Sequence, residues 1–345
     1  MDSEQKIDLD LTPIMLVETA EDQNSDFHPK TFDDYCGQTE LKTKLKLYTD
    51  AARQRGEPLD HLLLFGPPGL GKTTLAQIMA AVMQVGIKIC SGPTLERTGD
   101  LVSLLSSLES RDILFIDEIH RLPAPVEETL YSAMEQFRID IIIGQGAGAK
   151  SVNLPINPFT LIGATTKAGM ISAPLRSRFG ITERIDFYTD GELTEIILQN
   201  VTHLGISIET EGAALLAHCS RGTPRIAKKL LRRIRDFAQI NNNNHASSEL
   251  IQKALLFLRI DHEGLNAVDH AIINTIINHF DGGPVGLETI ASMIGEESAT
   301  IEDVYEPFLM RKGYLEKTPR GRQIPRTKLS SLKHRFDGQK TIWDT

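Results

Sequence analysis

The chain of 345 residues has a formal net charge of −9, with 41% apolar and 24% charged residues. This length and composition predict a soluble globular protein of two or three domains, and no apolar run is long enough to span a bilayer. Three widely spaced cysteines without a CxxC pair argue against a disulfide framework and a zinc site. The N-terminus lacks the layout of a signal peptide, so we expect a cytoplasmic protein.

Charge is distributed unevenly along the chain. Residues 1–26 contain eight acidic residues, one lysine and little hydrophobic pattern, which predicts a mobile acidic tail. Residues 311–335 instead contain nine lysines and arginines and a single glutamate. A phosphate backbone responds to the local field, so the negative total does not exclude a nucleic-acid partner. A solvated surface or a disordered tail is the alternative interpretation of the basic run.

An α/β pattern begins at His61. Short apolar runs at 62–65, 113–116 and 159–162 are typical of buried parallel strands. Helical stretches lie between these runs, and this βαβ alternation predicts an α/β fold with a doubly wound parallel sheet.

The first strand is followed directly by a glycine-rich motif. Residues Gly66–Thr73 match G-x-x-x-x-G-K-[ST] at every fixed position, between a predicted strand and a predicted helix. The glycines allow backbone N–H groups to surround phosphates, and the helix N-terminus adds positive potential. Lys72 would reach the β- and γ-phosphates, and the Thr73 hydroxyl would ligate Mg²⁺. The motif therefore indicates a P-loop nucleotide site rather than a chance turn before a helix.

The second strand carries two carboxylates, Asp117 and Glu118, at its C-terminal end, where sheets of this kind bind ligands. Asp117 is expected to hold Mg²⁺ through water, and Glu118 to orient and deprotonate the attacking water. A lone Asp-Glu pair is commonly a solvated turn, but its combination with Lys72 favours ATP hydrolysis. His120 has no evident partner, so we expect it to be structural.

Residues 137–156 lie between the second and third strands and are interpreted as a β-hairpin with a glycine-rich turn at 144–148. Ile141 and Ile143 on this hairpin would suit an interaction site if they are exposed. A plain hairpin packed on the core is the alternative.

The pattern becomes helical after Asp190. Residues 190–260 are predicted to form several helices, and from His262 further helices precede a short β-like stretch that carries the basic C-terminus.

Motifs along this order resemble those of the RuvB family, AAA+ ATPases that drive branch migration of Holliday junctions as hexamers. The resemblance covers residues 27–325, and the P-loop and the Asp-Glu strand alone identify only the broad ATPase class. The motifs that carry it are residues 66–74, 114–122, 163–166, 174–180, 221–225, 282–286 and 318–322.

The resemblance implies roles at matching positions. Thr166 resembles the polar sensor of the γ-phosphate, and Arg225 resembles the sensor that closes the lid domain on nucleotide. Arg178 matches the arginine finger supplied to the neighbouring subunit, a contribution worth about 10³ to 10⁵ in rate. Without the resemblance, each arginine would be interpreted as part of a surface salt bridge or of a solvated helix face.

The nucleotide-binding set is also implied by the resemblance. It comprises Phe27, His28, Gly69, Gly71, Lys72, Thr73, Thr74, Glu135, Gln136, Phe137, Tyr188 and Arg225. The chain departs from the family at His28, Gln136, Lys150 and Lys167, where Arg, Asp, Arg and Arg are usual. Lysine keeps the charge of arginine but loses its planar fork, which puts details of nucleotide affinity and partner docking in doubt.

The resemblance extends to domains and partners. It implies an AAA+ domain at 27–188, a helical lid at 189–261 and a winged-helix domain at 262–335, with tails at 1–26 and 336–345. In the winged helix, Lys317, Arg320 and Arg322 surround a Pro/Gly turn and would meet phosphates without reading bases. The hairpin would receive a RuvA-type junction-binding protein.

The implied activity is ATP-driven translocation of double-stranded DNA at four-way junctions. It serves recombination, DNA repair and the SOS response in the bacterial cytoplasm, with ATP and Mg²⁺ as cofactors and a RuvC-type resolvase in the wider complex. A clamp-loader-like AAA+ switch would share the P-loop but lack the basic winged helix. A protein-remodelling ATPase would display an aromatic pore loop, and at 6% aromatic residues the chain offers no convincing candidate.

Overall fold

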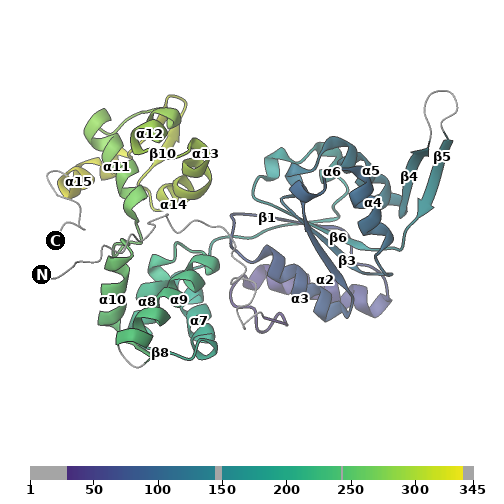
Figure 1. The fold of residues 1–345 in the computed structure, drawn as a ribbon, viewed down its shortest axis with the longest axis horizontal. Coiled ribbons are helices and arrows are strands. Elements are labelled where there is room, and N and C mark those ends of the chain that lie inside the picture. The colour runs from purple at the N-terminus through teal and green to yellow at the C-terminus, as the bar shows by residue number, and fades with distance from the viewer. Residues whose placement is uncertain (1–28, 144–149, 242–243, 337–345) are drawn as a thin grey trace, which may run out of the picture. The chain divides into compact units, whose positions relative to one another are not determined.

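The computed structural model describes residues 29–143, 150–241 and 244–336, so the acidic tail lies outside the described part (Figure 1). The described residues form two compact units. One contains residues 29–196 and Gly222–Arg225, and the other contains residues 197–221 and 226–336. Within these ranges, every helix is too short or too polar to cross a membrane.

A five-stranded sheet, parallel throughout, forms the centre of the first unit. The three predicted strands are confirmed and occupy its middle. The two unpredicted strands are its edges, where side chains are half-buried or exposed and leave no continuous apolar run. The order across the sheet is β2 (Ile87–Ser91), β3 (Ile113–Asp117), β6 (Thr160–Thr165), β1 (Leu62–Phe65) and β7 (Ile181–Arg184).

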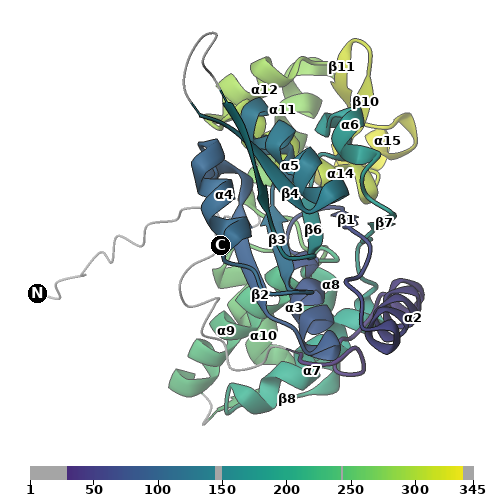
Figure 2. The same cartoon turned by 90° about the vertical axis from the view of Figure 1, so that its right-hand side faces the viewer.

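Helices cover both faces of this sheet, as the α/β pattern predicts (Figures 1 and 2). On one face lie α2 (Thr39–Arg55) and α3 (Lys72–Met83). On the other face lie α4 (Thr98–Ser106) and α5 (Ala124–Gln136). Their apolar side chains form one buried cluster with Leu63 of β1, with residues of β3 and β6, and with Phe159. The short helix α6 (Ala173–Arg176) follows β6 and adds Leu175 to that cluster.

The hairpin between α5 and β6 is confirmed at the level of the backbone. Strands β4 (Arg138–Ile143) and β5 (Lys150–Pro155) pair antiparallel, with Ile141 opposite Val152. They project away from the sheet in Figure 1. The turn at 144–149 lies outside the described residues.

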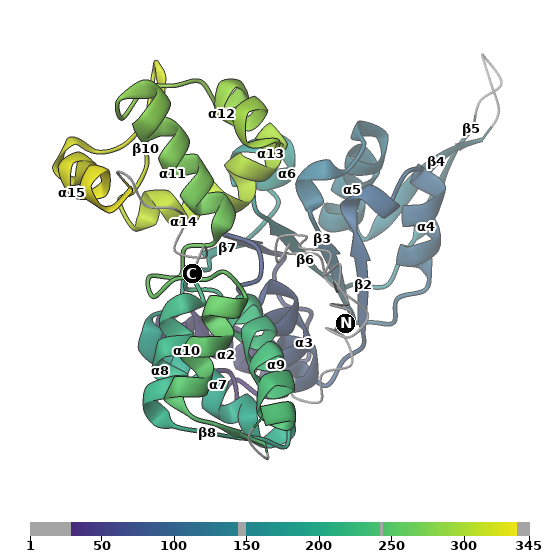
Figure 3. The same ribbon diagram turned by 60° about the vertical axis from the view of Figure 1, so that its left-hand side comes forward.

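The second unit begins with a helical bundle (Figure 3). A two-residue parallel ladder joins β8 (Ser207–Ile208) to β9 (His245–Ala246), and it is too short for any periodicity to predict. The helices of the bundle are α7 (Asp190–His203), α8 (Thr210–Cys219), α9 (Pro224–Asn241) and α10 (Ser248–Phe257). The first half of α7 and the first two residues of α9 are assigned to the first unit.

A winged-helix fold completes the second unit. The wing is a short antiparallel ladder of β10 (Glu316–Thr318) and β11 (Gly321–Gln323). The basic C-terminal stretch was predicted to be β-like. For the residues after the wing this prediction is wrong, because they form a final helix whose Leu332 packs into the buried core of the winged helix. The helices are α11 (Ala267–Phe280), α12 (Leu287–Ile294), α13 (Ser298–Thr300), a π-helical turn (Ile301–Tyr305), α14 (Glu306–Arg311) and α15 (Arg326–Phe336).

Candidate active site

The P-loop connects β1 to α3 and is packed so closely that only glycine fits at key positions. A Cβ on Gly66 would lie 2.3 Å from the carbonyl oxygen of Ile185, and one on Gly69 would lie 2.9 Å from Cβ of Arg225. Gly69 and Gly71 also have φ of 76° and 95°, a region that glycine enters without strain. The backbone can therefore turn its N–H groups inward at the N-terminus of α3, as phosphate binding requires.

Lys72 is the first residue of α3 and only 7% exposed. Its ammonium group donates hydrogen bonds of 2.9 Å to the carbonyl oxygens of Gly66 and Pro67. Burial lowers the pKa of Lys72 to about 8, and the charge of Arg225 acts in the same direction against the opposing charges of Asp117 and Glu118. Lys72 is thus held inside the loop by acceptors that phosphate oxygens can replace.

Asp117 is the last residue of β3 and Glu118 follows it, at the same carboxyl end of the parallel sheet as the P-loop. Asp117 accepts a hydrogen bond of 2.9 Å from the backbone N–H of Glu118. Glu118 has a left-handed backbone, with φ of 47°, and its carboxylate lies 2.9 Å from Arg121. A non-glycine residue in this region is uncommon, and such strain concentrates at functional sites.

Strand β6 carries a buried hydroxyl that links it to the Asp-Glu segment. Thr165 Oγ1 lies 2.9 Å from His120 Nδ1 and accepts a hydrogen bond of 2.9 Å from the backbone N–H of Lys167. Thr166 follows the strand and is exposed. His120 therefore has a partner that its place in the sequence did not reveal, and it holds the loop that presents Thr166.

Tyr188 and Arg225 reach the P-loop from segments far along the chain. The Tyr188 hydroxyl donates to Tyr35, at 2.6 Å, and also lies 3.2 Å from the carbonyl oxygen of Leu70. Burial raises the pKa of the Tyr188 hydroxyl, so it stays a neutral donor. The backbone N–H of Arg225 donates to the carbonyl oxygen of Gly69 at 3.3 Å. Tyr35 was not predicted, because no motif marks it.

Arg178, the predicted finger, lies against its own subunit. Its guanidinium carbon stands 4.3 Å above the ring of Tyr131, and its nitrogens lie 3.1 Å from Glu135 and 2.7 Å from the carbonyl oxygen of Pro174. Its Nε atom is buried without a hydrogen-bond partner. Tyr131 and Glu135 are both on α5, so this helix fixes the position of the Arg178 guanidinium.

The other residues predicted to contact nucleotide differ in their surroundings, and two of them lie outside the described residues. Gln136 is exposed at the end of α5, whereas the ring of Phe137 packs against Phe159 with centroids 6.1 Å apart. Thr73 and Thr74 are half-buried in the first turn of α3. Phe27 and His28 lie outside the described residues, as do the side chains of Ile141 and Ile143 on β4.

The wing separates its three predicted cations. Lys317 and Arg322 both pair with Glu306, at 2.8 and 2.6 Å, and Glu306 is only 1% exposed. Hydrogen bonds to Glu306 and Glu302 outweigh burial and raise the pKa of Lys317. Arg320 stands at the exposed turn, and within the described ranges its side chain has no ion pair.

The residues around the P-loop fit a magnesium–nucleotide complex. No cluster of three His, Cys, Asp or Glu side chains in the described residues could hold a metal ion by itself. Thr73 and Asp117 offer one hydroxyl and one carboxylate, and Mg²⁺ is usually held by so few protein ligands together with phosphates and water. The glycine cradle and Lys72, whose present partners are backbone carbonyl oxygens, supply the phosphate side of that arrangement.

Comparison with known proteins covers nearly all of the described residues. Residues 27–185 match the Holliday junction DNA helicase RuvB P-loop domain, 188–261 the RuvB AAA lid domain and 262–333 the RuvB C-terminal winged helix domain. The Holliday junction branch migration complex subunit RuvB of Staphylococcus saprophyticus is 53% identical over 313 residues, which are 90% of this chain and 94% of that protein. Its counterpart in Staphylococcus haemolyticus is 54% identical over 295 residues, covering 86% and 89%.

Solved structures give the same result. The RuvB Holliday junction branch migration motor of Thermotoga maritima is 47% identical and superposes with a TM-score of 0.79, covering 89% of this chain and 98% of that one. A point variant of that protein reaches a TM-score of 0.81. The predicted architecture of P-loop core, helical lid and winged helix is therefore confirmed, and so is the class of enzyme, an AAA+ ATPase motor. The chain belongs to the RuvB family of Holliday junction branch migration motors.

Proposed function

We propose that this protein hydrolyses ATP to drive double-stranded DNA through a ring of six identical subunits and so moves Holliday junctions. The observation that carries the proposal is the convergence of Lys72, Asp117, Glu118 and Arg225 on one loop, in a chain that also carries a basic wing. We assign the ATPase to 27–188, the lid to 189–261 and DNA binding to 262–335.

ATP and Mg²⁺ are the proposed cofactors. Lys72 would exchange the carbonyl oxygens of Gly66 and Pro67 for phosphate oxygens, while Thr73 and Asp117 hold the ion. The bound ion would neutralise charge that develops on the transferred phosphoryl group. Glu118 would orient the attacking water and accept its proton, and Thr166 would keep that water in line.

Arg178 would complete the site of the neighbouring subunit. It is held by Tyr131, Glu135 and Pro174 of its own subunit, which supports a preset direction rather than a freely moving chain. A charge that is already positioned costs less reorganisation in the transition state. Because each site would need Arg178 of a neighbouring subunit, turnover would require the assembled ring.

The remaining surfaces would engage DNA and partners. Arg320 at the wing turn would contact phosphates, with Lys317 and Arg322 shaping the wing behind it. The hairpin β4–β5 would receive a RuvA-type protein, and a RuvC-type resolvase would join the wider complex. The proposed setting is the bacterial cytoplasm.

A synthetic four-way junction tests the proposal. With ATP, Mg²⁺ and a RuvA-type partner, the parent protein should convert the junction to duplex products, and the Lys72→Ala variant should not. Duplex DNA should raise the ATPase rate, whereas a sliding clamp or an unfolded protein should not. Stimulation by either of those two, without junction movement, would favour a clamp loader or a protein remodeller.

A further inference from the structure

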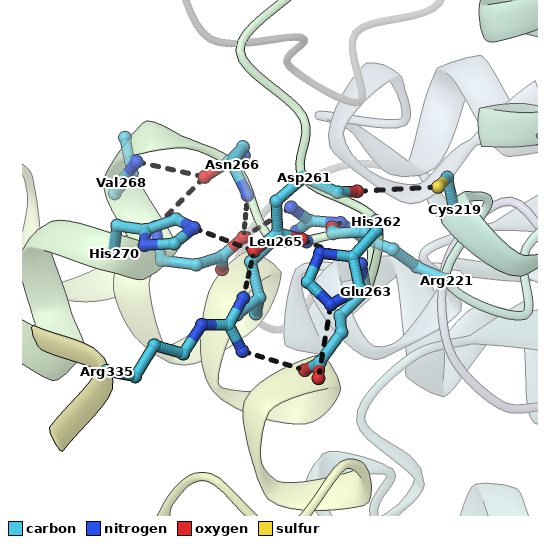
Figure 4. A network of polar contacts seen from close by, with 12 residues as sticks. Cys219, Arg221, Asp261, His262, Glu263, Leu265, Asn266, Val268, His270 and Arg335 are labelled. Carbon is cyan, nitrogen blue, oxygen red and sulfur yellow. Dashed lines mark hydrogen bonds and ion pairs between the residues drawn. The ribbon is translucent and has the colours of Figure 1, made fainter. Parts of the chain in front are cut away.

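A buried polar network joins the lid bundle to the winged helix in the second unit (Figure 4). Its centre is the linker between α10 and α11 together with the first turn of α11. Two acidic side chains there are almost inaccessible: Asp261 of the linker is 3% exposed, and Asp269 of α11 is 0% exposed. Acidic groups are rarely buried so completely unless they are paired.

Asp261 ties the linker to both ends of the winged helix. One oxygen accepts backbone hydrogen bonds of 2.9 Å from Glu263 and Leu265, and the other lies 2.9 Å from His270 and 2.8 Å from Arg335. His270 belongs to α11 and Arg335 to α15. These hydrogen bonds outweigh the effect of burial and lower the pKa of Asp261.

Arg221 is the connection from the lid side. It follows helix α8, and its side chain is 11% exposed. Its Nε donates to the carbonyl oxygen of Gly264 at 3.1 Å, its terminal nitrogen pairs with Asp269, and its guanidinium carbon lies 4.6 Å above the ring of Phe308. One lid residue thus contacts the linker, α11 and α14.

The same contacts lead on to the wing. Asp269 also accepts the backbone N–H of Asn266 at 2.8 Å and so completes the N-terminal cap of α11. Phe308 lies two residues after Glu306, the buried carboxylate that holds Arg322 of the wing. Contacts of Arg221 therefore fix both α11 and the helix on which the wing is anchored.

The backbone at Arg221 is held in an uncommon conformation. Arg221 and Gly222 have φ of 55° and 70°, and a left-handed arginine is strained. Such strain persists only where surrounding contacts hold the residue in place, and the side chain of Arg221 supplies them. The next residues along the chain end in Arg225, whose backbone N–H binds the P-loop at Gly69.

We infer that Arg221 is a positioning residue that makes the lid and the winged helix move as one body, so that the nucleotide state sensed at Arg225 is transmitted to the wing. The inference rests on the proposed function, because it assigns the route by which ATP turnover moves DNA. Arg221 itself contacts neither nucleotide nor DNA in this role.

Spin-label distances test the joint in the full chain. The joint is the set of contacts of Arg221 between the lid helices and the winged helix. One label is placed on each side of it, at Gln252→Cys on α10 and at Met293→Cys on α12, and both positions are exposed. Cys36 and Cys219 are buried, and Cys90→Ser removes the remaining native thiol. Labelled subunits are diluted with unlabelled ones, so that each ring contributes one pair. Arg221→Ala should broaden the distance distribution. Arg259→Ala, which removes an exposed arginine that is also left-handed, should leave it narrow.

ATPase rates test the transmission. Arg221→Ala should keep the rate without DNA within about twofold of the parent, and lose stimulation by duplex DNA by roughly tenfold, the size of a typical coupling between sites. A purely structural defect would lower both rates together. If Arg221→Ala does not fold, Arg221→Lys is used in its place. One ammonium group cannot bond to Gly264, pair with Asp269 and stack on Phe308 at the same time, so this variant should also keep its rate without DNA and lose stimulation by DNA.

A distance distribution as narrow as that of Arg259→Ala, or DNA stimulation equal to that of Arg259→Ala, would each overturn the inference. A parent protein that duplex DNA does not stimulate would count against the proposed function instead. The distance measurement would then still decide whether Arg221 holds the joint.

Discussion

At the scale of single residues, Lys72 and Glu118 act on different parts of the same reaction. Lys72→Ala should abolish nucleotide binding, because the buried ammonium is the charge that meets the β- and γ-phosphates. Glu118→Gln should bind ATP with near-parental affinity and lose turnover, because an amide cannot accept the proton of the attacking water. Equilibrium binding of a fluorescent ATP analogue and steady-state phosphate release measure the two effects separately. Parental turnover by Glu118→Gln would disprove its role.

The finger arginine depends on an aromatic neighbour. Tyr131→Leu should remove the aromatic ring under the Arg178 guanidinium and so leave this group free to move. A guanidinium that is not held in place stabilises the transition state less, so kcat should fall by roughly tenfold with little change in KM. Tyr131→Phe keeps the ring and loses only the hydroxyl that contacts Glu127 and Ser172, so it is the matched control. Equal kcat values for the two variants would show that the stacking is incidental.

Residues whose chemistry depends on short spacing could be predicted from the sequence. Lys72 and Thr73 are adjacent within one motif, and Asp117 and Glu118 end one apolar run, so local pattern and chemistry coincide. Contacts between distant segments could not be predicted, because nothing local encodes them. Tyr35 meets Tyr188 across 153 positions, and His120 meets Thr165 across 45.

At the scale of elements, the predicted strands were those whose side chains are buried on both faces. Strands β1, β3 and β6 lie in the middle of the sheet and are buried at every position but the last of β1 and of β3. The edge strands β2 and β7 mix half-buried and exposed side chains, and helix α15 is so basic that its few apolar contacts leave little periodicity. Partial burial weakens the pattern on which such predictions depend.

The wing is the element in which the structure refines a predicted binding site most. Arg320→Ala should weaken duplex binding equally for all sequences and flatten the log–log salt dependence by about one unit, because one phosphate contact is lost. Arg322→Ala should instead destabilise the domain by about 2–4 kcal/mol, because it leaves the buried Glu306 short of a partner. Duplex titrations at several salt concentrations and thermal unfolding distinguish the two effects.

The two wing variants serve as controls for each other. Arg320→Ala should unfold at the parental temperature, because its side chain is exposed. A parental salt slope in Arg320→Ala would show that the turn does not meet phosphate. A parental unfolding temperature in Arg322→Ala would show that Lys317 alone satisfies Glu306.

At the scale of the whole molecule, the question is whether each active site is shared between two subunits. Arg178→Ala leaves the P-loop and Glu118 of its own subunit intact but cannot serve a neighbour. Glu118→Gln has an inactive site of its own but still presents its finger. Each variant alone should be nearly inactive, since a finger of this kind is worth about 10³ to 10⁵ in rate.

Mixing the two variants under conditions of subunit exchange should restore part of the ATPase activity. Some interfaces of a mixed ring then pair an intact Glu118 with an intact Arg178, whereas no interface of either pure ring does. Phosphate release is measured against the mixing ratio, and recovery should be greatest at intermediate ratios, because only mixed neighbours are active. Adding Lys72→Ala subunits to Arg178→Ala subunits should give a similar recovery, because the Lys72→Ala subunit also retains its finger. Absence of recovery in rings shown to be mixed would mean that Arg178 acts within its own subunit, where Tyr131 and Glu135 already hold it, or has only a structural role.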